Sequence, residues 1–247
     1  LSPRATVSRR RFLQILGVGA GVGALVACAP AAQPPAAAPA AAEPAAAAET
    51  AGTAENGLMR PSGTPKKGGT LRTAFGITTA HYDMHQGGSA SVLCEVYGTL
   101  VRRNLVDGLR TVIPDLAESW EVAEDGLTYT FALRQGVKFH DGEPFTADDV
   151  VASFQRILNP PEGIVIPIKA DLAMVDAIEK VDDFTVKLNL SSPRAYFLDL
   201  LAGVSMVIYS KKTLEENNND LREVLLAPGT GAFKFVEYKT AEKWTFE

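Results

Sequence analysis

The chain has 247 residues and a formal net charge of −5, from 24 lysine and arginine residues against 29 aspartate and glutamate residues. A mildly acidic chain lacks the positive field that nucleic-acid binding needs, so a nucleic-acid partner is not expected. Two cysteines are too few for a disulfide framework or a cysteine-rich zinc site. These averages hide three segments of unlike composition: residues 1–27, residues 28–67 and the remainder.

The first 27 residues have the order of an export signal. Four arginines and no acidic residue precede an apolar run at residues 12–27. This run is too short and too rich in glycine for a membrane span. Residues 8–14 (SRRRFLQ) resemble a twin-arginine signal with Arg9 and Arg10 as its pair, and residues 25–28 (LVAC) resemble the lipobox of bacterial lipoproteins. The resemblance implies cleavage before Cys28 and a diacylglycerol on its sulfur, which anchors the protein to a membrane. An N-terminal anchor that is never cleaved is the alternative.

The second segment has the composition of a tether. Residues 29–54 are mostly alanine and contain five prolines, so they can build neither a long helix nor a core. Glycine and proline continue at short intervals up to residue 69. We therefore predict a disordered tether over residues 28–67.

The first patterns of the folded part are a strand, a loop and a helix. Residues 70–75 read as a strand, and a polar, glycine-rich loop follows. Residues 92–100 predict a helix that leads into a second strand, with Cys94 buried there as a small hydrophobic residue.

Two hairpins are expected further along the chain. Residues 116–133 predict one that turns at Asp125-Gly126, and the alternation of Leu127, Tyr129, Phe131 and Leu133 is typical of a half-buried strand. A second hairpin turns at Asp182-Asp183. The apolar face of its outgoing strand consists of Phe184, Val186, Leu188 and Leu190.

A helix is expected between the hairpins. Thr146 is its predicted N-cap, Asp149 completes a capping box, and Asn159-Pro160-Pro161 ends it. Its apolar stripe consists of Val150, Phe154, Ile157 and Leu158, and Phe145 is placed to pack on Val150.

The last elements are a helical stretch at residues 196–201 and strands at residues 232–238 and 243–246. The final strand stops in mid-pattern and the chain has no initiator methionine. We therefore expect a fragment of a longer protein.

The most recognisable sequence lies between residues 114 and 150. It reads PDLAESWEV (114–122), DGLTYTF (125–131), LRQGVKFHDG (133–142) and TADDV (146–150). It resembles family 5 of the bacterial extracellular solute-binding proteins, which are the oligopeptide, dipeptide and nickel receptors of ABC importers. Residues 68–72 (GGTLR) and 229–231 (GTG) also fall where that family has similar residues.

The resemblance implies an α/β fold of the periplasmic-binding-protein type II class, in which an α+β subdomain is inserted and a ligand cleft separates two lobes. Residues 68–99 would form the first segment of lobe I, residues 100–226 the subdomain, and residues 227–247 the truncated return into lobe I. The second lobe would follow Glu247 and is missing. It would carry the carboxylate that takes the amino terminus of a peptide.

Two loops are candidate ligand-binding segments. Gln86, Gly87, Gly88 and Ser89 follow the first strand, where similar peptide receptors touch their ligand. Gly229, Thr230 and Gly231 lie where the chain would return to lobe I, near the cleft. Small residues let a backbone approach a ligand closely, although turn chemistry alone also explains both loops.

Other patterns that resemble chemical sites have structural explanations. His81 and His85 are four residues apart, but two glycines follow and no carboxylate pair completes a metal site, so a solvent-exposed or cleft-rim loop is expected. Adjacent His140 and Asp141 point to opposite faces, so a turn is expected there rather than a catalytic pair. Asp148-Asp149 fits capping and the helix dipole better than acid–base catalysis. No nucleophile elbow, P-loop or dinucleotide motif is present, so no cofactor is predicted.

The sequence favours a monomeric, lipid-anchored receptor on the outer face of the cytoplasmic membrane or in the periplasm. It would capture a small solute, foremost a peptide, and deliver it to the permease of an ABC importer. Cleft closure around a ligand needs no covalent chemistry. The alternatives are an exported enzyme, whose hydrolase or cofactor site lies in the missing half, and a receptor of the same family for nickel or another solute.

Overall fold

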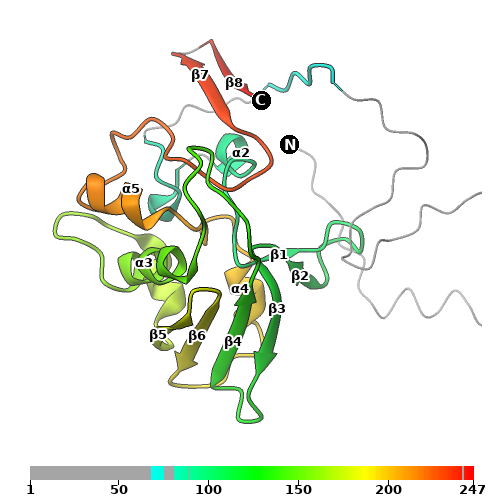
Figure 1. Ribbon diagram of the computed structural model, residues 1–247, viewed down its shortest axis with the longest axis vertical. Coiled ribbons are helices and arrows are strands. Elements are labelled where there is room, and N and C mark those ends of the chain that lie inside the picture. Colours follow the sequence, from blue (N-terminus) through cyan, green and yellow to red (C-terminus); the bar gives the residue numbers. More distant parts are fainter. Residues whose placement is uncertain (1–67, 75–80, 89, 241) are drawn as a thin grey trace, which may run out of the picture. The chain divides into compact units, whose positions relative to one another are not determined.

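A computed structural model describes residues 68–74, 81–88, 90–240 and 242–247 (Figure 1). All of them belong to one compact unit, residues 49–247. The predictions for Arg9, Arg10, Cys28 and Ser89 lie outside the described residues. No helix in the described ranges is long and apolar enough to cross a membrane.

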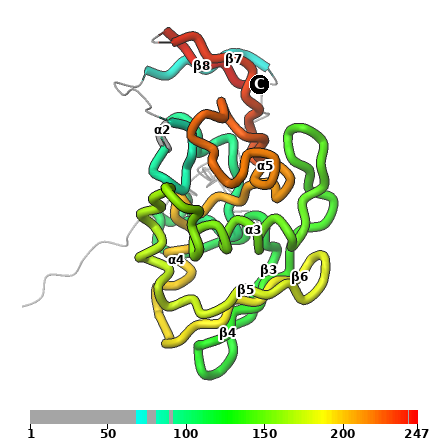
Figure 2. The backbone as a smooth tube through the Cα atoms, turned by 90° about the vertical axis from the view of Figure 1, so that its left-hand side faces the viewer, coloured from blue at the N-terminus to red at the C-terminus, as the bar shows by residue number. Residues whose placement is uncertain are grey.

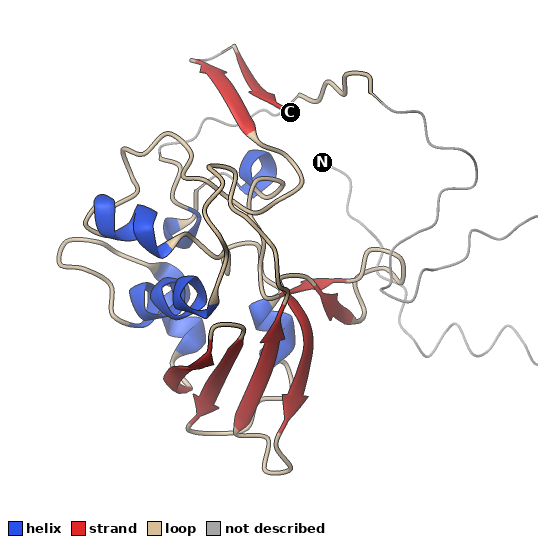
Figure 3. Cartoon of the chain, viewed as in Figure 1, coloured by secondary structure: helices blue, strands red, loops and turns tan. Residues whose placement is uncertain are grey.

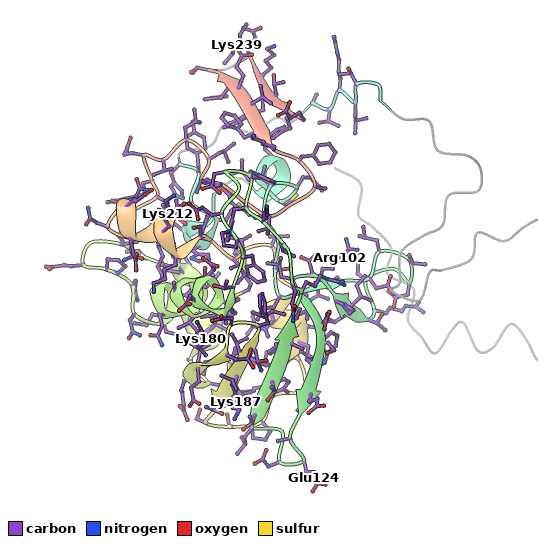
Figure 4. The ribbon with its side chains drawn as sticks, viewed as in Figure 1. Arg102, Glu124, Lys180, Lys187, Lys212 and Lys239 are labelled. Atoms are coloured by element: carbon purple, nitrogen blue, oxygen red, sulfur yellow. The ribbon has the colours of Figure 1, made fainter. Side chains whose placement is uncertain are left out.

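A four-stranded antiparallel sheet in the order β3-β4-β6-β5 is the main β structure (Figure 3). Its strands are β3 (Ala117–Val122), β4 (Thr128–Leu133), β5 (Val175–Asp182) and β6 (Thr185–Leu190). Both predicted hairpins are confirmed, because β3 pairs with β4 and β5 pairs with β6. In the first turn, where Figure 4 labels Glu124, the Leu127 N–H donates to the Asp125 carboxylate at 2.9 Å and Gly126 takes a φ of 69°.

Helix α3 (Ala147–Leu158) packs against β5 and β6, as Figure 2 shows. The predicted start and end are confirmed. The Thr146 N–H donates to the Asp149 carboxylate at 2.8 Å, and the helix ends at Asn159. The resulting core contains the predicted faces of β4, β6 and α3, and its fully buried members include Phe131, Val186, Leu188, Phe154 and Val150.

A second buried cluster joins segments far apart in the sequence. It includes Met84, Leu93 and Tyr97 from the early chain, with Tyr209 and Leu214 from the later chain. Its elements are the 3-10 helix η1 (Met84–Gln86), α2 (Ala90–Leu93), α5 (Lys211–Glu216), β7 (Phe235–Lys239) and β8 (Lys243–Phe246). β7 and β8 pair with each other, so the last predicted strand has a partner.

The remaining elements are β1 (Val101–Arg103), β2 (Val112–Pro114), η2 (Pro167–Leu172) and α4 (Phe197–Leu201). α4 matches the predicted helical stretch. The helix and strand expected within residues 92–100 are displaced, because α2 covers only Val92 and Leu93 of that range and β1 begins after it, at Val101. The β1–β2 hairpin, η2 and α5 were not expected from the sequence.

Two predictions about the early chain are wrong. The described residues 70–74 of the expected first strand form no strand and are exposed. A strand needs a partner for its backbone groups, and none of the described strands pairs with this segment. Cys94 is only partly buried, because it follows the last turn of α2 beside the exposed Glu95.

Candidate functional site

The first candidate loop is a tight turn around η1. Asp83 caps η1, and Gly87 follows it in the left-handed conformation with a φ of 86°. The Gly88 N–H donates to the Asp83 carbonyl at 2.8 Å, and a Cβ on Gly88 would lie 2.8 Å from the same oxygen. The turn itself therefore requires both glycines.

The Asp83 carboxylate is the centre of this turn and is fully buried. From helix α3, Arg156 donates to it twice, from Nη1 to Oδ1 at 3.2 Å and from Nη2 to Oδ2 at 2.5 Å. The Gln86 side chain donates to Oδ2 at 2.7 Å, and the His85 N–H donates to Oδ1 at 3.1 Å. Despite the burial, Arg156 and these other donors hold the pKa of Asp83 below its ordinary value, so the carboxylate is ionised. Gln86, predicted to touch a ligand, thus uses its amide within the turn.

His85 is fully buried, so the expectation of an exposed or cleft-rim position is wrong for this residue. Its Nε2 lies 2.9 Å from the Val207 carbonyl, and its Nδ1 lies 2.9 Å from Nη1 of Arg156. Because arginine only donates, Nδ1 accepts and Nε2 carries the proton of a neutral imidazole. Burial, followed by the charge of Arg156, lowers the pKa of His85 to about 4. Sequence reasoning placed this histidine wrongly because its partners are remote in the chain.

Tyr209 connects this charged group to the second candidate loop. The Met84 N–H donates to its hydroxyl at 2.8 Å. Its ring packs edge-on against His85, with centroids 4.8 Å apart, and against Tyr97, with centroids 5.2 Å apart. The Arg156 guanidinium lies 6.0 Å from the centre of the Tyr209 ring.

The second candidate loop, Gly229-Thr230-Gly231, packs against residues 95–98. The Gly231 N–H donates to the Val96 carbonyl at 2.8 Å, and Thr230 Oγ1 accepts from the Gly98 N–H at 3.2 Å. A Cβ on Gly229 would overlap the Val96 carbonyl oxygen and one on Gly231 would overlap that of Glu95. The contact of chain on chain therefore explains both glycines.

His140 holds the same loop from its other side. Its backbone N–H donates to the Gly229 carbonyl at 2.9 Å, and its Nε2 lies 3.0 Å from the Gly231 carbonyl. Asp141 and Gly142 form the predicted turn, in which the Gly142 N–H donates to the Phe139 carbonyl at 2.9 Å. The interpretation of His140-Asp141 as structural is confirmed.

The turn around η1 and the second candidate loop therefore border the same buried pair of rings, Tyr97 and Tyr209, which pack edge-on. A Cβ on Gly229 would lie 2.9 Å from the Tyr97 ring, while η1 contacts Tyr209 at the other end of the pair. Sequence reasoning missed Arg156 and Tyr209, which complete this arrangement. The signal for Arg156 was its spacing from Asp149 and Ser153, at positions that share one helix face beside the apolar stripe.

The paired carboxylates Asp148 and Asp149 support helices, as predicted. Lys180, labelled in Figure 4, lies 2.7 Å from Asp148 and lowers the pKa of that carboxyl. Burial raises the pKa of Asp149, which caps α3 and also accepts from the Lys211 N–H at the start of α5, at 2.8 Å.

Other features of the described surface do not coincide with the candidate loops. In the described ranges, no group of three or more histidine, cysteine, aspartate and glutamate residues could hold a metal ion. One surface pocket of about 310 Å³ is lined by residues that include Met174, Ser191, Arg194 and Tyr196. Neither candidate loop contributes to its lining.

Comparison with known proteins identifies the class to which this fold and these loops belong. Residues 111–247 match the family model described as bacterial extracellular solute-binding proteins, family 5 Middle. The match covers more than half of the chain. The chain therefore belongs to the family 5 bacterial extracellular solute-binding proteins, which are transport receptors, and the predicted resemblance is confirmed.

Individual relatives carry names for different solutes. Haem-binding protein A of Haemophilus influenzae is 40% identical in an alignment of 168 residues, and the match covers 59% of this chain and 30% of that protein. Di/tripeptide-binding protein 2 of Pseudomonas aeruginosa is 40% identical in an alignment of 152 residues, and the match covers 53% of this chain and 28% of that protein. The chain thus spans about 30% of the length of the curated relatives that it matches.

A solved structure matches the fold. It is the ABC transporter-associated periplasmic binding protein DppA from Helicobacter pylori in complex with the peptide STSA. The TM-score is 0.59 at 30% sequence identity, and the match covers 67% of this chain and 36% of that one. The described fold thus resembles part of a periplasmic binding protein, in agreement with the predicted fold class.

Proposed function

We propose that this chain is part of a receptor that captures a small solute, foremost a short peptide, for an ABC importer. The observation that carries the proposal is the family 5 match over residues 111–247. Relatives named for di- and tripeptides, and a similar solved structure in complex with a peptide, support the peptide class. The relative named for haem makes another solute the nearest alternative.

Residues 86–89 and 229–231 are the proposed ligand contacts. Their support is that Gly229 lies against the Tyr97 ring, while the turn that contains residues 86–88 meets Tyr209 through Met84 and His85. Tyr97 and Tyr209 pack edge-on, although the two loops are more than 130 positions apart in the chain. In this proposal residues 68–99 and 227–247 belong to lobe I, and residues 100–226 form the α+β subdomain. The buried clusters support this division only in part. The early segment shares a cluster with Ala227 and Phe235, but Tyr209, Leu214 and Leu221, from within residues 100–226, belong to the same cluster.

The solute class is tested with the protein as its gene encodes it, including any residues that follow Glu247. Calorimetric titration with trialanine, haem and a nickel–histidine complex should give saturable heat with trialanine. Mass spectrometry of the mixture should recover the peptide unchanged. Hydrolysis of the peptide would favour an exported enzyme, and heat with haem or nickel–histidine alone would favour another solute.

Lipid anchoring through Cys28 is proposed from the twin-arginine and lipobox resemblances, with delivery to the membrane permease as its purpose. Two acyl chains anchor a protein firmly, and the tether keeps a receptor near its partner at high effective concentration. Labelled palmitate should enter the wild-type protein and not the Cys28→Ser variant. A Cys94→Ser variant is the matched control and should label normally; loss of label in that variant would contradict the assignment.

A further inference from the structure

The buried ion pair of Arg156 and Asp83 joins two segments at a large cost in desolvation free energy. Both side chains have no exposed surface, so both charges have lost their hydration. A well-packed apolar pair often stabilises a fold as well as such an ion pair does. Stability alone therefore explains this ion pair poorly. The geometry that the pair imposes on the surrounding segments explains it better.

Four of the five N–H groups of Arg156 donate to partners within the described residues. Nη1 and Nη2 contact both carboxylate oxygens of Asp83, and Nη1 also lies 2.9 Å from Nδ1 of His85. Nε donates to the Asn219 carbonyl at 2.9 Å. The guanidinium thus fixes η1 against both helix α3 and the chain after α5.

The Asp83 group in turn determines the shape of the candidate loop. Its side chain accepts from the His85 N–H and from the Gln86 amide, and its carbonyl accepts from the N–H groups of Gln86 and Gly88. Every described residue from 85 to 88 except Gly87 therefore bonds to Asp83 directly. A shift of Asp83 moves the whole turn.

We propose that Arg156 is a positioning residue that holds Asp83–Gly88 in the geometry with which residues 86–88 meet the solute. This proposal rests on the proposed receptor function. Lysine is not an adequate replacement, because a single ammonium lacks the planar fork that reaches two carboxylate oxygens and an imidazole together.

The first test is hydrogen exchange of backbone amides in the protein as its gene encodes it, and it needs no ligand. In Arg156→Lys, amides of residues 84–88 should exchange about tenfold faster, which corresponds to losing one or two hydrogen bonds. Amides of β4 and β6 should change little. Ser153→Ala is the matched control: Ser153 is buried one helical turn earlier, and it bonds the Tyr209 backbone rather than η1.

The proposal is overturned if Arg156→Lys leaves exchange of residues 84–88 unchanged, or raises it only in proportion to the sheet amides. If Arg156→Lys does not fold, the neutral double variant Asp83→Asn/Arg156→Gln replaces it, because the two substitutions together remove both buried charges. The same local increase is expected there. Equal protection of residues 84–88 in the double variant and the wild type would contradict the proposal.

The second test measures solute affinity in the protein as its gene encodes it, with trialanine as the probe. Arg156→Lys should weaken binding about tenfold or more, while Ser153→Ala should stay within about twofold of wild type. Equal affinities in wild type and Arg156→Lys, together with faster exchange of the loop, would overturn the link to solute. If wild type binds no trialanine, the peptide function fails on its own, and hydrogen exchange still decides whether Arg156 positions the turn.

Discussion

Acid should destabilise this fold through His85 well before the carboxylates are protonated. The imidazole is fully buried and faces the positive Arg156 on one side and the Tyr209 ring on another. Asp83 is the nearest negative group, but its carboxylate is directed to Arg156 and Gln86. Protonation of Nδ1 would place a charge inside the core and against the Arg156 cation. Burial is the larger cause of the lowered pKa, and the charge of Arg156 is the second.

The sign and size of the effect follow from two pKa values. The pKa of His85 is about 4 in the folded chain and about 6.5 in an unfolded one. Between pH 6.5 and pH 4, His85 binds a proton in the unfolded chain but not in the folded chain. The contribution of His85 is therefore fully present above pH 6.5 and is lost as the pH falls to about 4. At 1.36 kcal/mol per pH unit, the loss is about 3 kcal/mol.

The assay is urea unfolding followed by tryptophan fluorescence between pH 7.5 and 4.0. The wild type should lose about 3 kcal/mol more than His85→Gln over this range, because glutamine cannot titrate. Ser153→Ala should lower the whole wild-type curve without changing its shape. Parallel curves for wild type and His85→Gln between pH 6.5 and 4 would refute the assignment of a buried neutral imidazole.

Three further predictions test packing and reactivity. Gly229→Ala should lower the melting temperature more than Gly163→Ala. The methyl group added at Gly229 would overlap the Val96 carbonyl, whereas the one added at Gly163 has open space and costs only the strain of a φ of 78°, about 1 kcal/mol. Equal shifts of the melting temperature would contradict the packing argument. Phe131→Ala should lower the urea unfolding free energy by about 3–5 kcal/mol, since Phe131 is fully buried in the sheet core; a loss below about 1 kcal/mol would count against that core. Burial and the charge of Glu95 raise the pKa of the Cys94 thiol, so iodoacetamide should alkylate it more slowly than free cysteine at pH 8, and Glu95→Gln should accelerate the reaction; a rate above that of free cysteine would contradict this.

Local patterns were enough to predict the sheet and its main helix. The alternation of β4 and β6 and the capping box of α3 each lie within about ten consecutive residues, so periodicity and cap chemistry determine them. The segment at residues 70–74 was also predicted as a strand, but a strand needs a partner, and a partner is a property of the whole chain.

The candidate site was harder to predict because its contacts are remote in sequence. His85 meets Arg156 across 71 positions and Val207 across 122. Periodicity and capping patterns, which span only neighbouring residues, cannot predict such contacts. The two glycine loops were recognised by their composition and by family resemblance. Arg156, which holds the first loop, and Tyr209, which packs on Tyr97 beside the second, required the structure.

The central claim is that this chain serves a receptor that binds a solute without altering it. The most direct measurement is equilibrium binding of trialanine to the protein as its gene encodes it, followed by mass spectrometry of the peptide. The account predicts saturable binding, with one peptide per protein recovered intact. Cleavage of the peptide, or no saturable binding of trialanine, haem or nickel–histidine, would contradict it.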